Sequence, residues 1–176
     1  MSQDPKKVNS KKDTSSEAVE GGPMEGILTQ WRRERPDIDP APMAVCGEVW
    51  RAGEKLRQGV LDNIASYNLD FAGMDVLFTL RRQGEGETLS PSLLAKDMML
   101  STSAMTNRLD RLEKRGLVER MMDPNDRRGQ MVALTSEGFD LANEVVVTHV
   151  AREEKMLSNL SDQERQQLRT LLEKIV

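Results

Sequence analysis

Arginine and amide side chains gather in one short stretch of this 176-residue sequence. Between Ser101 and Gln130 there are seven basic residues and five acidic ones, in a chain whose formal net charge is −4. Guanidinium groups bind phosphate and, like Asn side chains, hydrogen-bond base edges in the DNA major groove. The stretch therefore offers side chains for nucleic-acid binding, although the net charge of the chain does not favour it. An ordinary solvated surface is the alternative that the charges alone leave open.

The helical pattern of this stretch separates an apolar side from a polar side. Ser101 is expected to cap a helix over residues 102–115 that ends at Gly116. At 100° per residue, Met105, Leu109 and Leu112 share an inward arc, and the opposite arc holds Ser103, Asn107, Arg111 and Lys114. We expect DNA contacts from the helix start and this polar side: Ser101, Thr102, Ser103, Thr106, Asn107 and Arg111.

The helix has the neighbours of a winged helix-turn-helix. A short helix precedes it, capped by Ser90 with a proline in its first turn. Two short strands follow, at residues 117–122 and 130–134, and the loop between them ends in Arg127 and Arg128. Arginine at the tip of such a wing suits the negative potential of a narrow minor groove, so we expect both arginines to contact DNA. Asp126 either pairs with Arg128 or forms a turn.

The remaining chain predicts a mainly α fold with a small β-wing. The composition, 38% apolar with six aromatic residues and eleven Met, favours packed helices over a β-sandwich. Residues 1–22 are polar and predict a disordered tail, and residues 23–176 a single domain. Within it we expect a short N-terminal helix, a long helix over 43–66, the winged helix-turn-helix over 71–134, and two helices after Thr135, the second opened by a capping box at Ser161.

Several classes of protein are disfavoured by what the sequence lacks. No apolar run is long enough to cross a membrane and the N-terminus does not resemble a signal peptide, so we expect a cytoplasmic protein. One Cys and one His leave no disulfide and no zinc site. The acidic Gly-rich segment at residues 84–87 does not suit phosphate, and we expect neither an enzyme nor a cofactor.

Four motifs carry a family resemblance: TNRLDRL at residues 106–112, GLVER at 116–120, DPNDRR at 123–128 and LTSEG at 134–138. They strongly resemble the MarR family of bacterial regulators. Residues 31–37 (WRRERPD) and 71–77 (FAGMDVL) resemble its PecS/HucR branch, whose members have an extra N-terminal helix and respond to urate. The resemblance implies a homodimer, formed through the helices over residues 43–66 and 135–176, that represses by occupying a pseudo-palindromic operator in double-stranded DNA.

A ligand site is a further expectation from this resemblance. On the helical wheel Asp75 lies about 40° from Phe71 and about 60° from Phe78, so its carboxylate is directed toward an apolar side and requires a partner. The resemblance implies that a small purine-like anion is bound by Trp31, Asp75, Arg108 and Arg120. The alternative is a structural salt bridge between Asp75 and an arginine, with Trp31 filling the core.

Three further alternatives stay open at the level of the sequence. Cys46 is either a peroxide-sensing thiol, as in some relatives, or a small buried apolar residue. His149 either titrates between pH 5 and 8 and loosens a dimer, or is inert. A winged helix can also be a protein-interaction module that binds no DNA.

Overall fold

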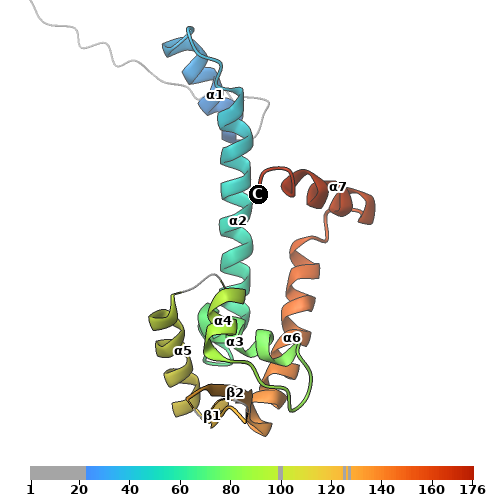
Figure 1. The fold of residues 1–176 in the computed structure, drawn as a ribbon. Coiled ribbons are helices and arrows are strands. Elements are labelled where there is room, and N and C mark those ends of the chain that lie inside the picture. Colours follow the sequence, from blue (N-terminus) through green and yellow to red (C-terminus); the bar gives the residue numbers. More distant parts are fainter. Residues whose placement is uncertain (1–22, 99–100, 125, 127) are drawn as a thin grey trace, which may run out of the picture. The chain divides into compact units, whose positions relative to one another are not determined.

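The computed structural model describes residues 23–98, 101–124, 126 and 128–176. The predicted disordered tail and Arg127 lie outside the described residues. The described residues form seven helices and two strands (Figure 1): α1 (Pro23–Glu34), α2 (Ala41–Ala65), α3 (Phe71–Arg81), α4 (Pro91–Asp97), α5 (Thr102–Lys114), β1 (Val118–Met122), β2 (Gln130–Leu134), α6 (Ser136–Met156) and α7 (Asp162–Leu172). The mainly α architecture with a two-stranded wing is confirmed.

The chain divides into two compact units, with the boundary inside α2, after Ala52. The described part of the first unit contains α1 and the beginning of α2. Leu28 is buried on α1, and Gly47 of α2 faces Met24, whose sulfur would lie 3.0 Å from a Cβ atom at that position. The missing side chain at Gly47 therefore leaves room for Met24 between the two helices.

The second unit, Gly53–Val176, is built around one hydrophobic core. Its most buried members come from every element except α7 and include Ile64, Val76, Leu77, Leu80, Leu94, Met105, Leu109, Val118, Val132 and Val145. The three apolar residues that the helical wheel places on the inner side of α5 are at most 3% exposed. This burial fixes which side of α5 faces solvent.

Side-chain caps begin the helices where the sequence predicts them. Ser90, Ser101 and Thr135 accept hydrogen bonds from backbone N–H groups three residues ahead, at the starts of α4, α5 and α6. Ser161 and Glu164 form the predicted capping box of α7. Gly116 has a φ of 71°, in the left-handed region that ends α5 after its last turn.

The wing is a two-stranded antiparallel sheet in which Val118 pairs with Leu134 and Arg120 with Val132. A third segment, which the sequence analysis did not predict, joins it: Leu89 exchanges two backbone hydrogen bonds with Val132, of 2.8 and 3.0 Å. Two strands alone are marginally stable. The Leu89 bridge therefore attaches the wing to the segment between α3 and α4.

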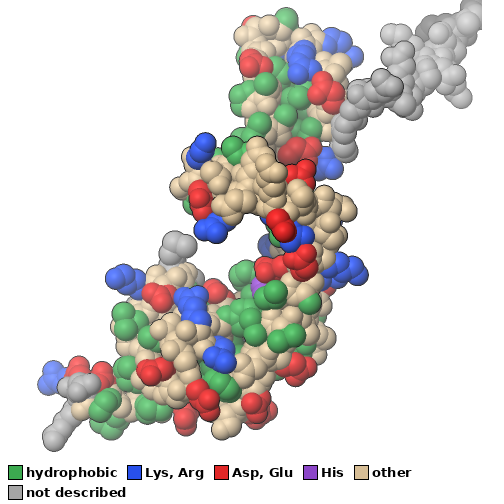
Figure 2. All heavy atoms as spheres, turned by 90° about the vertical axis from the view of Figure 1, so that its right-hand side faces the viewer, with side chains coloured by type: hydrophobic (Ala, Val, Ile, Leu, Met, Phe, Trp, Pro, Cys, Tyr) green, Lys and Arg blue, Asp and Glu red, His purple; other side chains and the backbone are tan. Residues whose placement is uncertain are grey.

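Apolar side chains remain exposed on the last two helices. On α6 Val147 and Val150 are 69% and 58% exposed, and on α7 Leu171 is 50% exposed. Figure 2 shows a group of exposed hydrophobic side chains on one face of the molecule. The Arg165 guanidinium holds α7 to α6 through two 2.7 Å hydrogen bonds to Glu154, and this lowers the pKa of that carboxyl. None of the described helices is apolar enough over sufficient length to cross a membrane.

Candidate nucleic-acid interface

The exposed side of α5 carries the polar residues that the sequence assigns to it. Ser103, Asn107 and Arg111 are exposed, opposite the buried arc of Met105 and Leu109. Ser101 caps the helix by accepting a hydrogen bond from the Ala104 N–H at 3.3 Å. Thr102 is the first residue of α5, and Thr106 is exposed one turn later. The start of α5 and its polar side therefore form one surface on the outside of the fold.

The described part of the wing tip is a tight turn with an exposed arginine. Arg128 is exposed, and its backbone N–H donates a 2.9 Å hydrogen bond to the carboxylate of Asp126. The Gly129 N–H donates to the Asp126 carbonyl oxygen at 2.8 Å. Of the two interpretations of Asp126, the turn is confirmed. The turn holds the backbone of Arg128 at the end of the wing.

Arg111 has a partner that the sequence analysis missed. Its guanidinium lies 3.3 Å from one carboxylate oxygen of Asp70, whose other oxygen caps α3 by accepting from the Gly73 N–H at 2.7 Å. The two paired side chains are 73% and 58% exposed. An exposed ion pair of this kind contributes about 0–1 kcal/mol, so a phosphate group can compete with Asp70 for Arg111.

Arg108 and Arg115 lie beside Arg111 on a pocket of about 480 Å³ between α5 and the turn that joins α2 to α3. Arg115 donates hydrogen bonds of 2.6 and 3.2 Å to the carbonyl oxygens of Asn68 and Tyr67. Asn68 has a positive φ of 54°. Arg115 thus fixes an unusual backbone turn, whereas Arg108 is half-buried and forms no ion pair with any described residue.

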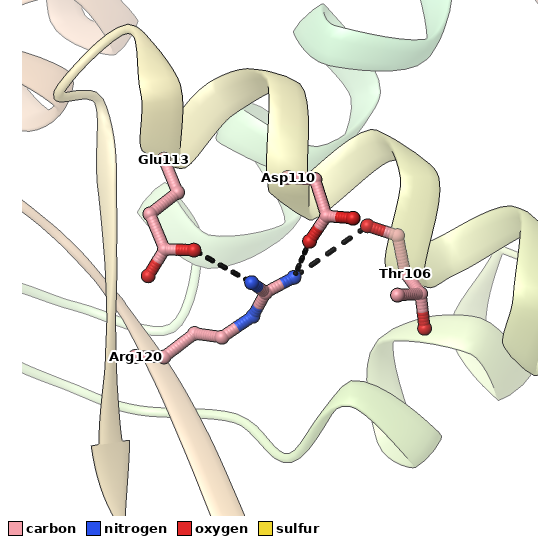
Figure 3. Close-up of polar contacts among 4 residues, drawn as sticks. All are labelled: Thr106, Asp110, Glu113 and Arg120. Atoms are coloured by element: carbon pink, nitrogen blue, oxygen red, sulfur yellow. Dashed lines mark hydrogen bonds and ion pairs between the residues drawn. The ribbon is translucent and has the colours of Figure 1, made fainter.

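Arg120 faces α5 from the other side, and its guanidinium joins the wing to the helix (Figure 3). It donates hydrogen bonds of 2.6 Å to Asp110 and 2.6 Å to Glu113, and a longer one of 3.5 Å to the Thr106 carbonyl oxygen. Its side chain is 20% exposed, less than either carboxylate. We call Arg120, Asp110 and Glu113 the Arg120 cluster.

Within the second unit, the structure does not bring the expected ligand residues Asp75, Arg108 and Arg120 together. Arg108 and the Arg120 cluster lie roughly 140–160° apart around α5, so the two arginines face different sides of the helix. Asp75 is half-buried, does not line the Arg108 pocket, and forms no ion pair with any residue in the described ranges. The alternative of a structural salt bridge at Asp75 is therefore wrong for the described part of the chain. Trp31 lies on α1, in the first unit, and is 40% exposed.

The two candidate sensor residues differ in their surroundings. Cys46 is a free, exposed thiol on α2, so the interpretation as a buried apolar residue is wrong. His149 is largely buried on α6, with its Nε2 atom 3.2 Å from Glu153 and its ring edge-on to Phe78 at 5.3 Å. Within the described ranges, no three His, Cys, Asp or Glu side chains are grouped so that they could hold a metal ion.

Comparison with known proteins shows which family the chain resembles. The sequence profile of the MarR family matches residues 73–129. The chain is 41% identical to the HTH-type transcriptional regulator PecS of Dickeya dadantii over 149 residues, which cover 85% of this chain and 90% of PecS. It is 31% identical to the HTH-type transcriptional repressor MdtR of Bacillus subtilis, over 63% of this chain and 70% of MdtR.

Solved structures agree with the sequence relatives. A cysteine-to-serine mutant of MarR from Escherichia coli, complexed with operator DNA, is similar with a TM-score of 0.68 and 25% identity, over 78% of this chain and 96% of that one. AbsC from Streptomyces coelicolor has the same fold, with a TM-score of 0.71 and 23% identity, over 78% of this chain and 93% of that one. The chain belongs to the MarR family of helix-turn-helix transcriptional regulators and is similar to PecS over most of its length.

Proposed function

We propose that this regulator is a repressor that binds a pseudo-palindromic operator as a homodimer and leaves it when a small anion binds. The observation that carries the DNA contact is the exposed polar side of α5, with Ser103, Asn107 and Arg111 opposite its buried arc. In a helix-turn-helix this side of the second helix enters the major groove. The solved MarR relative in complex with operator DNA supports the same role here.

In the proposed complex the side chains divide between reading and positioning. Ser103 and Asn107, near the start of α5, contact base edges, with Ser101, Thr102 and Thr106 close by. Arg111 contacts phosphate after leaving Asp70. Arg128, with Arg127, enters the minor groove at the flank of each half-site. The two α5 helices of a dimer then lie about one DNA turn apart.

Selection of bound sequences from random DNA tests this proposal. We expect enrichment of an inverted repeat whose half-sites are separated by about ten base pairs. Binding should weaken steeply as salt is raised, because several guanidinium groups displace counterions. No enrichment, combined with no retention on heparin, would contradict the proposal and favour a winged-helix module that binds other proteins.

For the release of DNA we propose a purine-like anion, with urate as the first compound to test. The proposal rests on the similarity to the PecS branch and concerns Trp31, Asp75, Arg108 and Arg120. Arg108 faces a pocket with two other guanidinium groups, which would stabilise a bound anion. At Arg120 an anion would have to replace the carboxylates of Asp110 and Glu113.

Titration of urate against the protein–operator complex tests the ligand. We expect release of DNA by the wild-type protein at millimolar or lower urate, and little release from the variants Asp75→Asn and Arg108→Gln. The variant Asp140→Asn, which removes an exposed carboxylate from α6, should respond like the wild type. Undiminished binding of intact wild-type protein at millimolar urate would exclude urate and leave the DNA-binding proposal untouched.

The exposed thiol of Cys46 supports a second sensing mode, in which peroxide oxidises it. Repression in cells should then lose its response to peroxide in the variant Cys46→Ser. An unchanged peroxide response of that variant would eliminate the thiol as sensor.

A further inference from the structure

Arg120 lies on a rung of the wing at which both strands are attached to neighbouring segments of the fold. Arg120 pairs with Val132 across the sheet, and Val132 is the residue that forms the backbone bridge to Leu89. On the β1 side the attachment is the Arg120 cluster, and on the β2 side it is the Leu89 bridge. Both attachments therefore act on one rung of the antiparallel ladder.

Beyond this rung the strands are held by little besides one another. Val118 and Val132 are only 2% and 0% exposed, but Met121 and Met122, the next residues of β1, are 38% and 69% exposed. Two paired strands without further packing are marginally stable and bend easily. The direction of the wing tip, where Arg128 lies, therefore depends on how the rung at Arg120 is held.

We propose that Arg120 is a positioning residue for DNA binding, which sets the place of the wing tip relative to the exposed side of α5. Its planar guanidinium has donors for two carboxylates on α5 at once, and these lie one turn apart at Asp110 and Glu113. This inference rests on the proposed contact of the wing with DNA. It assigns to Arg120 a task that requires no ligand.

A charge effect accompanies this geometry and has to be separated from it. Asp110 and Glu113 lie on the helix that approaches DNA, and Arg120 offsets one of their two negative charges. If neutralisation were the whole role of Arg120, removing the two carboxylates would strengthen DNA binding, because less negative charge would face the phosphates. If Arg120 positions the wing, the same change detaches β1 from α5 and weakens binding.

The double variant Asp110→Asn, Glu113→Gln distinguishes neutralisation from positioning. It removes both negative charges and keeps the shape of both side chains. On DNA recovered by the selection described above, we expect about tenfold weaker binding than wild type. Hydroxyl-radical footprinting should show lost protection at the flanks, where the wings lie, and retained protection at the centre of each half-site. The thermal unfolding midpoint should stay near that of the wild type.

Two further variants serve as rescue and control. Arg120→Lys keeps the charge but cannot hold two carboxylates with one planar group, so it should weaken binding less than Arg120→Gln and restore part of the flank protection. Glu119→Gln removes an exposed carboxylate from the same strand outside the cluster, and it should keep full flank protection.

Tighter binding of the double variant with intact flank protection would overturn the inference and leave only neutralisation. Full affinity of Arg120→Gln would overturn it as well. If the wild-type protein itself gave no protection at the flanks, the proposed wing contact would be wrong, and the positioning role would fall with it. The inference is supported if the double variant binds more weakly and loses protection at the flanks but not at the centre of each half-site.

Discussion

At the scale of single residues, three arginines on α5 or shortly after it have different tasks, because their guanidinium groups point in different directions. Arg111 is exposed on the polar arc, Arg115 fixes the carbonyl groups of the α2–α3 turn, and Arg120 is held by two carboxylates. A count of charges cannot separate these tasks. Their partners do, and a guanidinium whose donors are already satisfied has less to offer a phosphate.

Base reading and the charge that the wing contributes can be separated with two substitutions. Asn107→Ala should cost about 1–3 kcal/mol on the preferred operator and relax the preference for one base pair, because an amide that reads a base edge is lost. Arg128→Ala should weaken binding to all sequences alike and reduce the salt slope by about one. Quantitative binding to the operator and to single-base-pair mutants of it, each at several salt concentrations, measures both effects.

Arg169→Ala is the control for charge, since Arg169 is exposed on α7 and paired with Glu173. It should change neither the base preference nor the salt slope. An unaltered ranking of operator mutants by Asn107→Ala would remove Asn107 from the reading surface.

At the scale of elements, the start of α6 requires a glycine, although glycine has a low helix propensity. Gly138 lies in the first turn of α6, and a Cβ atom there would overlap the carbonyl oxygen of Leu117, which accepts a hydrogen bond from the Thr135 N–H. The close approach joins the end of the helix-turn-helix to the helix after the wing. Glycine is needed here for space, although its φ is not in the left-handed region.

Gly138→Ala should therefore destabilise the protein by about 1–3 kcal/mol, because overlap with the backbone outweighs the gain of up to about 1 kcal/mol in helix propensity. Gly53→Ala on α2 is the matched control, since a Cβ atom there meets nothing within 4 Å. That variant should gain about 0.5–1 kcal/mol. Urea unfolding of both variants measures the difference, and a stabilised Gly138→Ala would contradict the close approach.

Local signals explain which elements the sequence predicted. The caps at Ser90, Ser101, Thr135 and Ser161 act on backbone groups three residues away, so their effect can be inferred from the sequence itself. The Leu89 bridge and the contacts of Arg115 and Asp70 join segments that are distant in sequence. No periodicity marks such pairs, because they depend on how the helices pack.

The candidate site follows the same division. The exposed side of α5 was predictable, because one helical period determines which residues are buried and which face solvent. The separation of Arg108 from Arg120 was not, since it depends on where β1 returns beside α5. A shared motif places both arginines at matching positions, but it does not say on which side of the helix each guanidinium lies.

At the scale of the whole molecule, the apolar side of α7 is only partly covered by the described residues of the second unit. Its Leu168, Leu171 and Leu172 are 41%, 50% and 37% exposed, on a helix whose other residues are polar or charged. Burying a stripe of this kind between two chains is worth about 25 cal/mol per Å² of apolar surface. In the proposed homodimer, this stripe and the exposed valines of α6 contribute to the interface.

Leu171→Glu should therefore dissociate the dimer at micromolar concentration, because it places a charge in an apolar contact. Gln166→Glu is the matched control, since it adds the same charge to an exposed polar position roughly 140° away on the same helix. Sedimentation velocity should show a monomer for the first variant and a dimer for the second. Operator binding should fall in parallel, because one monomer reads only one half-site. A dimeric Leu171→Glu with full operator affinity would remove α7 from the interface.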